Sequence, residues 1–194
     1  MELIRNGTFE TNSSSTHAIA IVKDNDYKVP KNVNFNFGEF GWEYAIYKET
    51  SDKASYLYTM IQYFDGEYIP GLDKKDGYIS KMKEYLDEEG ITYKFEEPTV
   101  SDYGWGEHGY VDHGAFNLDI IENILKDKET FFRFLFDERS YVSTGNDNDR
   151  GYYIPGIGYQ TDDAYWDDYN ELNEKWDNSI KELKKEYDIY FKGN

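Results

Sequence analysis

Apolar residues recur at intervals of three or four near the end of the chain, and this pattern constrains the fold more than any other in the sequence. The stripe consists of Tyr165, Tyr169, Leu172, Trp176, Ile180, Leu183 and Tyr187. Such spacing places the residues on one face of an α-helix. We therefore predict an amphipathic C-terminal helix over residues 161–190, packed on or extending from a domain formed by residues 1–160.

The charged residues of this predicted helix are unevenly distributed. Acids concentrate in its N-terminal half, where they suit the positive end of the helix dipole, and lysines lie near its C-terminal end. The acids that we expect to contact a partner are Asp167, Asp168, Glu171 and Glu174. Two interpretations remain open: a solvated helix packed on the domain, or a coiled-coil-like arm for homodimerisation or partner docking.

The preceding sequence alternates between helical and strand patterns. Apolar residues at helical spacing predict helices over residues 51–64, 76–89 and 116–126. The apolar residues 130–136 fit either a buried helix or a strand, and we favour a helix because a capping segment, Asp-Lys-Glu-Thr, leads into them. Alternating or short continuous apolar runs predict strands over residues 18–22, 33–37, 91–95 and 141–143. Together these patterns predict an α+β fold: a small mixed or antiparallel sheet from the first half, about four helices, and the long C-terminal helix along one side.

Composition limits the class of protein. The chain has 194 residues, enough for a substantial core, and it has no cysteine, which excludes disulfides and zinc–thiolate sites. No apolar run approaches the ~20 residues of a membrane-spanning helix. The N-terminal residues lack the basic and apolar regions of a signal peptide. We therefore expect a soluble, cytoplasmic protein that does not enter a membrane.

The formal net charge of the chain is -18. A surface of this charge repels phosphates, so direct binding to nucleic acid is not expected. Solubility alone is met by a net charge of about 2 to 8 in magnitude. The excess favours a protein partner that itself has a basic nucleic-acid-binding surface. The 20 Tyr, 12 Phe and 4 Trp residues exceed what a minimal core needs and also favour contact with a partner.

A dense polar segment opens the chain and leads directly into the apolar residues 18–22. Its candidate ligand-binding residues are Arg5, Glu10, Asn12, Ser13, Ser14, Ser15 and His17. In one interpretation, backbone amides, hydroxyls and Arg5 bind a phosphate, and Glu10 or His17 acts as an acid–base group. In the other, the short polar side chains bond to their own backbone and Arg5 pairs with Glu10.

The same segment resembles the opening of a group of small uncharacterised proteins from bacteriophages and their low-GC bacterial hosts. The match is carried by Arg5, Gly7, residues 9–16 and His17. The resemblance implies a phage or mobile-element setting. It supplies no activity that can be transferred to these residues.

Residues 101–114 form a second polar stretch, interrupted by four glycines. His108 and His113 lie there among carboxylates, but an interval of five residues does not align two metal ligands on a helix face. We favour a surface loop, without a metal or cofactor, that presents aromatic side chains to a partner. These side chains are Tyr103, Trp105 and Tyr110.

Two function hypotheses follow from these features. In the first, the protein is an acidic, phage-type antagonist that mimics nucleic acid and occupies the basic surface of a host protein, such as an immune or defence protein. In the alternative, it is a small enzyme or binding protein for a nucleotide or phosphorylated small molecule, with its site in residues 5–17. The first is favoured because charge and aromatic content are properties of the whole chain. The sequence assigns no catalytic residue.

Overall fold

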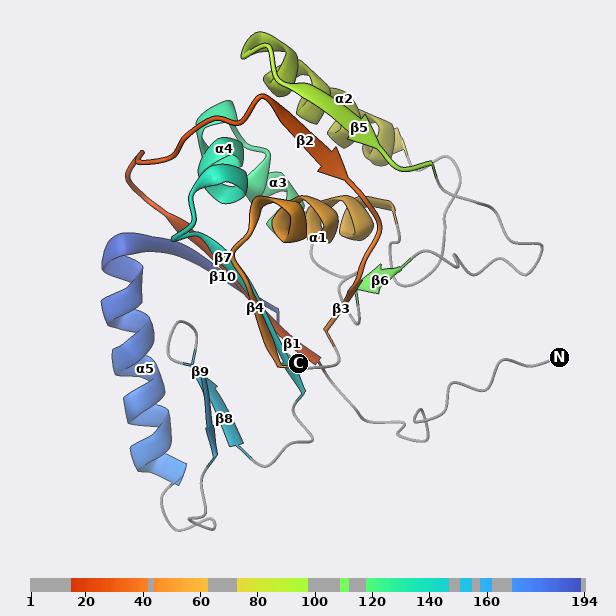
Figure 1. Ribbon diagram of the computed structural model, residues 1–194. Helices are drawn as coiled ribbons and strands as arrows, with labels where there is room; N and C mark the ends of the chain where they lie inside the picture. Colours follow the sequence, from red (N-terminus) through yellow and green to blue (C-terminus); the bar gives the residue numbers. More distant parts are fainter. Residues whose placement is uncertain are drawn as a thin grey trace, which may run out of the picture.

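The computed structural model describes residues 15–41, 44–62, 73–97, 109–111, 118–146, 151–154, 158–161 and 169–192. A four-stranded sheet with the order β10-β1-β7-β4 lies at the centre of these residues (Figure 1). Its strands are β1 (Ser15–Val22), β4 (Ala45–Tyr47), β7 (Tyr141–Asn146) and β10 (Tyr187–Lys192). Every neighbouring pair in this sheet is antiparallel.

Strand β1 is interior to the sheet and is buried on both faces. Ile19 and Ile21 point into the hydrophobic core, whereas Ala18 and Ala20 are buried on the opposite face. A strand with both faces buried has a continuous apolar sequence instead of an alternating one. The strand predicted over residues 18–22 is therefore confirmed, and β7 and β10 supply its two hydrogen-bonding neighbours.

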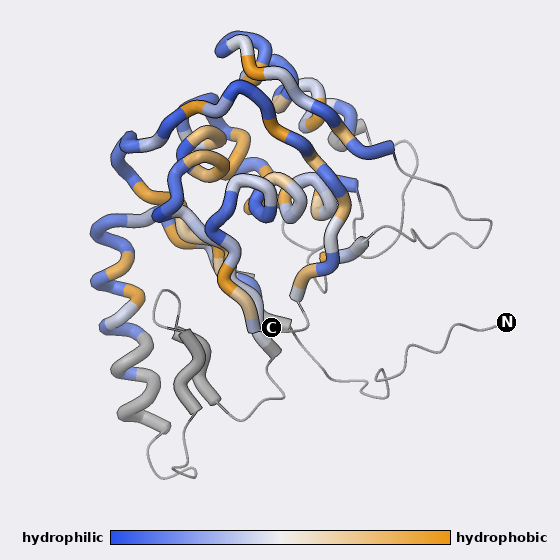
Figure 2. Tube along the Cα trace, in the orientation of Figure 1, coloured by the Kyte–Doolittle hydropathy of each residue, from blue (hydrophilic) through white to orange (hydrophobic). Residues whose placement is uncertain are grey.

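Two helices pack in the core beside this sheet. Helix α1 (Thr50–Gln62) packs against α4 (Lys128–Phe136), and α4 packs on β1. Figure 2 shows strongly hydrophobic residues along α4. Asp127 caps this helix, because its side chain accepts a hydrogen bond of 2.7 Å from the backbone amide of Thr130. The predicted helix over residues 130–136 is thus confirmed, together with its capping signal.

The remaining elements extend the core away from the sheet. Helix α2 (Asp73–Glu88) is followed by Gly90, whose φ of 66° suits a helix C-terminus, and then by β5 (Thr92–Phe95). Strand β5 pairs in parallel with β2 (Asn32–Phe35), and α1 packs on β2. Helix α3 (Leu118–Ile124) packs against α4.

Five further elements complete the described part of the fold. Strand β3 (Glu39–Phe40) pairs in parallel with β6 (Tyr110–Val111). Strands β8 (Gly151–Ile154) and β9 (Gly158–Thr161) form an antiparallel pair. Helix α5 (Tyr169–Glu186) contacts β8 and joins β10 without an intervening loop (Figure 1).

The predicted arrangement of the fold is wrong. The chain does not end in a helix over residues 161–190, because α5 ends at Glu186 and the following residues form β10. The central sheet does not come from the first half alone, since β7 and β10 supply two of its four strands.

The error at the C-terminus has a physical cause. Tyr187 fits the helical spacing of the apolar stripe, but Tyr187, Ile189 and Phe191 also alternate as in a strand. The two patterns overlap at this point, so local periodicity does not distinguish them. Six residues of β1 pair with Tyr187–Lys192, and these backbone hydrogen bonds favour the strand.

Candidate functional site

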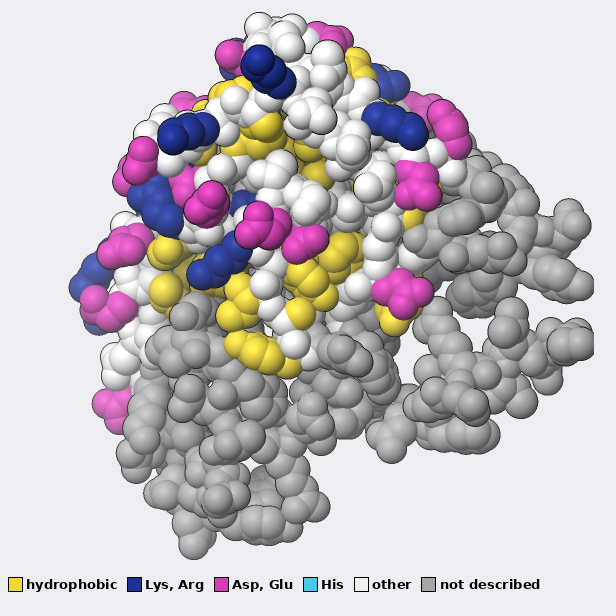
Figure 3. Space-filling model, in the orientation of Figure 1, with side chains coloured by type: hydrophobic (Ala, Val, Ile, Leu, Met, Phe, Trp, Pro, Cys, Tyr) yellow, Lys and Arg dark blue, Asp and Glu magenta, His cyan; other side chains and the backbone are white. Residues whose placement is uncertain are grey.

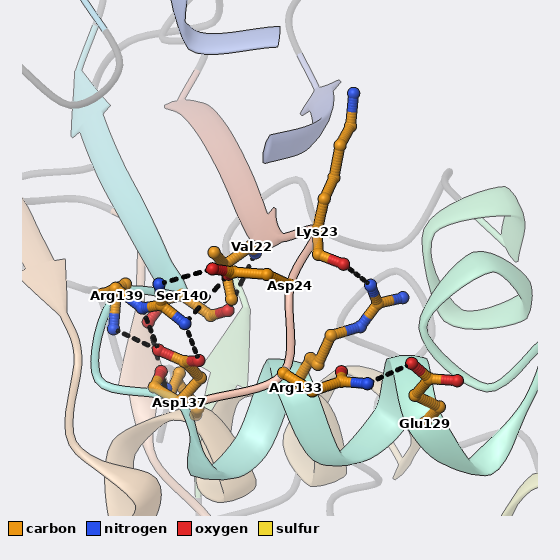
Figure 4. Close-up of polar contacts among 10 residues, drawn as sticks. Val22, Lys23, Asp24, Glu129, Arg133, Asp137, Arg139 and Ser140 are labelled. Atoms are coloured by element: carbon orange, nitrogen blue, oxygen red, sulfur yellow. Dashed lines mark hydrogen bonds and ion pairs between the residues drawn. The ribbon is translucent and has the colours of Figure 1, made fainter. Parts of the chain in front are cut away.

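The densest polar cluster in the described residues lies where β1 ends and β7 begins, beside the C-terminus of α4 (Figure 4). We call it the junction network. It consists of Lys23, Asp24, Lys53, Arg133, Asp137, Arg139 and Ser140. These residues come from segments that are far apart in the sequence.

Lys53 is the buried cation of the junction network. Its Nζ atom donates to the backbone oxygens of Asp137, at 2.7 Å, and Ser140, at 3.0 Å. Burial penalises the ammonium more than the nearby carboxylates favour it, which lowers the pKa of Lys53 to about 8. The side chain therefore ties α1 to the turn between α4 and β7.

Asp137 is the buried carboxylate of the network. Its Oδ1 atom accepts hydrogen bonds from the backbone amide and Nε of Arg139, at 3.0 and 2.9 Å, and Oδ2 accepts from Nη2 at 2.7 Å. Burial alone would raise the pKa of Asp137, but these hydrogen bonds and the charges of Arg139 and Lys53 lower it below its ordinary value. Arg139 also pairs with the exposed Asp24 at 3.0 Å.

Lys23 connects the end of β1 to α5. Its Nζ atom donates to the backbone oxygen of Lys184 at 2.6 Å, and its backbone amide donates to the oxygen of Glu186 at 2.9 Å. Arg133 of α4 donates to the backbone oxygen of Lys23, as Figure 4 shows. The junction network is therefore engaged mainly with groups of its own chain, and its evident role is to hold α1, α4, α5 and the sheet together.

His17 is the sequence-predicted ligand residue whose side chain the structure describes. The imidazole is 1% exposed, and its Nδ1 atom lies 3.1 Å from the hydroxyl oxygen of Tyr56 on α1. The two ring centroids are 5.9 Å apart. His17 therefore lies in the core at the start of β1. Ser15 begins the same strand, and the other predicted ligand residues, Arg5, Glu10, Asn12, Ser13 and Ser14, lie outside the described residues.

Three of the predicted partner-binding residues, Tyr110, Glu171 and Glu174, lie in elements that the structure describes. Tyr110 is half-buried in β6, and its backbone amide donates to Gly38 at 2.9 Å. Glu174 is exposed on α5, and Glu171 lies one turn before it in the same helix. Tyr103, Trp105, Asp167 and Asp168 lie outside the described residues, as do His108 and His113.

One residue of the junction network, Lys53, could have been recognised from the sequence. Lys53 lies four residues before Leu57, which places a lysine on the same apolar stripe of the predicted helix over residues 51–64. A charged residue at a core position needs a partner. The partners are carbonyl oxygens 84 and 87 residues further along the chain, so the sequence did not reveal them.

Two properties of the described residues bear on function class. None of the described helices combines the length and apolar character that a membrane crossing requires. Within the same part of the chain, no group of three or more histidine and carboxylate side chains is placed to hold a metal ion. Comparisons with models of protein families, with curated proteins and with solved structures found no match to this chain.

Buried tyrosines give a prediction about alkaline pH. Burial raises the pKa of Tyr141 to about 12, and it raises the pKa of Tyr56 further. Because a phenol ionises near pH ~10 in the unfolded chain, stability from these groups is present below that pH and is lost as the pH rises through the folded values. We expect Tyr141→Phe to reduce this alkaline loss, as measured by urea unfolding between about pH 9 and 11, the range around the pKa of a free phenol.

The same variant tests the environment of the Tyr141 hydroxyl. That oxygen is buried and is among the described side-chain atoms that have no hydrogen-bond partner. Removing it should leave stability at neutral pH unchanged or raise it by up to about 1 kcal/mol. Lys53 has a lowered pKa in the folded protein, so it changes the stability in the opposite direction as the pH rises. Both proteins contain Lys53, so its contribution cancels in the difference in stability between variant and parent. A loss of stability at neutral pH would contradict the assignment.

Proposed function

We propose that the protein is an acidic binding protein that antagonises a host protein by occupying its basic nucleic-acid-binding surface. The N-terminal half of α5 and the acids just before it would form the main contact. The observation that carries the proposal is the concentration of charge there. Residues 162–177 contain seven acids and one lysine. Glu174 and Asp177 are exposed on α5, and neither forms an ion pair with another described side chain.

The spacing of these acids supports nucleic-acid mimicry. Glu171, Glu174 and Asp177 follow one another at intervals of three residues in α5. With a rise of about 1.5 Å per residue, the helix carries one carboxylate per ~4.5 Å of its axis. One strand of duplex DNA carries a phosphate per ~3.4 Å. The density of carboxylates along this half of α5 is therefore comparable with the density of phosphates along a nucleic-acid strand.

Charge on the rest of the described surface is more balanced. Figure 3 shows acidic and basic side chains mixed over the described part of one face. Some acids of the described residues are paired: Lys128 lies 3.0 Å from Glu88 and 2.7 Å from Glu89. Such pairing reduces the local negative potential, so the described surface outside α5 is a weaker candidate for a phosphate-like surface.

The second hypothesis, a phosphate-binding site in residues 5–17, receives less support. Of its candidate side chains, the structure describes that of His17, which is buried against Tyr56. In this position the imidazole is not available to solvent as an acid–base group. A protein-binding function needs no such group, and Glu174 and Asp177 of α5 are exposed.

The proposal is tested by capturing partners from a host lysate on the immobilised protein at low and high salt. We expect a basic nucleic-acid-binding protein to be recovered, and we expect a DNA duplex to compete with its capture. Recovery should fall as salt rises, because the Debye length is about 10 Å at 0.1 M salt and shorter above it. Copurification of a phosphate-bearing small molecule, with no protein recovered at any salt, would show that the proposal is wrong.

Charge reversal on α5 gives a sharper prediction. The triple change Glu171→Lys, Glu174→Lys and Asp177→Lys should weaken partner binding at least about tenfold, because like charges then face the basic surface. The matched control reverses three exposed acids elsewhere, Asp26, Glu84 and Glu97. Both variants change the net charge equally. Circular dichroism checks that each variant is folded, and titration of the captured partner then distinguishes a local contact on α5 from a general effect of charge. Equal weakening by both variants would contradict a docking role for α5.

A further inference from the structure

Lys23 makes contacts that converge on the C-terminal end of α5. Its Nζ atom bonds to the oxygen of Lys184 at 2.6 Å and lies 3.9 Å from the carboxylate of Asp188. Its backbone amide bonds to the oxygen of Glu186. Figure 4 shows the Lys23 side chain extending away from α4, while its backbone oxygen accepts from Arg133 of that helix. One residue of the β1 end is thus bonded to both helices.

The contact with Lys184 has a specific physical effect on the helix. The last four carbonyl groups of an α-helix have no partner within the helix, and Lys184 lies within the last turn of α5. An ammonium at this position both bonds to a carbonyl and complements the negative end of the helix dipole. Because this ammonium comes from the residue after β1 and not from α5 itself, it also fixes the direction in which the helix leaves the sheet.

We infer that Lys23 is a positioning residue that preorganises α5 for binding, so that the partner meets its acids on a helix of fixed orientation. This inference rests on the proposed function of α5. Ile180 supports it, because this residue is 8% exposed and anchors the C-terminal half of the helix by burial. Glu174 and Asp177 lie immediately before this anchored half and are exposed. A fixed helix loses less conformational freedom when it binds, which slows dissociation.

The test compares Lys23→Met with two other variants. Lys23→Arg keeps a cationic donor at the same position, and Lys28→Met removes the charge of another exposed lysine in the loop after β1. In the free protein, Lys23→Met should speed amide hydrogen exchange in the last turn of α5 about fivefold, which corresponds to about 1 kcal/mol for one hydrogen bond. Lys23→Arg should restore most of the protection, and Lys28→Met should not change it.

Dissociation from the captured host protein is then measured by adding an excess of a fluorescent DNA duplex, which binds the basic surface as each variant leaves it. Lys23→Met should dissociate from that protein about fivefold faster than Lys28→Met, for the same loss of one hydrogen bond. The dependence of affinity on salt should be the same for the two variants, because they have the same net charge.

Unchanged hydrogen exchange in Lys23→Met would overturn the inference whatever the partner is. Faster exchange with dissociation equal to that of Lys28→Met would also overturn it, because the contact would then be structural without serving recognition. If the triple charge reversal on α5 leaves partner capture intact, the proposed function fails and the inference fails with it. Hydrogen exchange in Lys23→Met tests the contact between Lys23 and α5 independently of the proposed function, so the two failures can be distinguished.

Discussion

Replacing Asp137 by alanine is expected to lower the free energy of unfolding by about 3 kcal/mol. The carboxylate is 2% exposed, accepts three hydrogen bonds from Arg139 and lies near the charged Lys53. Its removal leaves the buried ammonium of Lys53 without this nearby negative charge. This expected loss is at the lower end of the range for breaking a buried ion pair, because the Arg139 side chain is 40% exposed and can turn towards water. Thermal unfolding should show a fall in Tm of about 6–12 °C.

Asp24→Ala is the matched control for this change. Asp24 pairs with the same guanidinium group, at 3.0 Å, but its side chain is 68% exposed. An exposed ion pair contributes about 0–1 kcal/mol, so the control should lose little stability. Similar losses in the two variants would contradict the importance of burial at Asp137.

The Asp137 variant also has a predicted pH dependence. Because the pKa of Asp137 is lowered in the folded protein, its contribution to stability is present above its unfolded pKa and is lost as the pH falls through the folded value. The difference in stability between parent and Asp137→Ala should therefore shrink below pH ~4. Urea unfolding at a series of acidic pH values measures it. A difference that stays constant into acid would show that Asp137 does not act through its charge.

The second large effect is expected for Gly109→Ala, which should lower the free energy of unfolding by about 2–4 kcal/mol. Gly109 has a φ of 145°, a value that favours glycine. A Cβ atom added there would lie 2.2 Å from the backbone oxygen of Gly38, and that oxygen accepts the hydrogen bond from Tyr110. The substitution would therefore separate β3 from β6 and expose Val111, which is 4% exposed in the parent protein.

Gly77→Ala provides the opposite expectation. Gly77 lies in α2, is exposed, and has open space around an added Cβ atom. Alanine should raise stability there by about 0.5–1 kcal/mol, because it restricts the unfolded chain and favours the helix. Denaturant unfolding of both variants measures the contrast. If Gly109→Ala is as stable as the parent, the close approach of Gly109 to Gly38 is wrong.

The candidate site was only partly accessible to sequence reasoning. Sequence reasoning placed Glu171 and Glu174 on a C-terminal helix, and both lie in α5, with Glu174 exposed. His17 was expected to lie beside a buried strand because of the apolar residues that follow it. Its contact with Tyr56 joins residues 39 positions apart and buries the ring, and no local pattern indicates that contact.

The sequence by itself determined the elements whose signals are local. Asp127 followed by an apolar run specifies α4, because a cap and a helical face both act within a few residues. Gly90 likewise marks the end of α2, since its positive φ favours glycine. The tertiary structure alone decided the choice between helix and strand at Tyr187 and the burial of Lys53. In both cases the deciding hydrogen bonds come from distant segments, β1 for the strand and the turn after α4 for the lysine, and a local pattern contains no information about them.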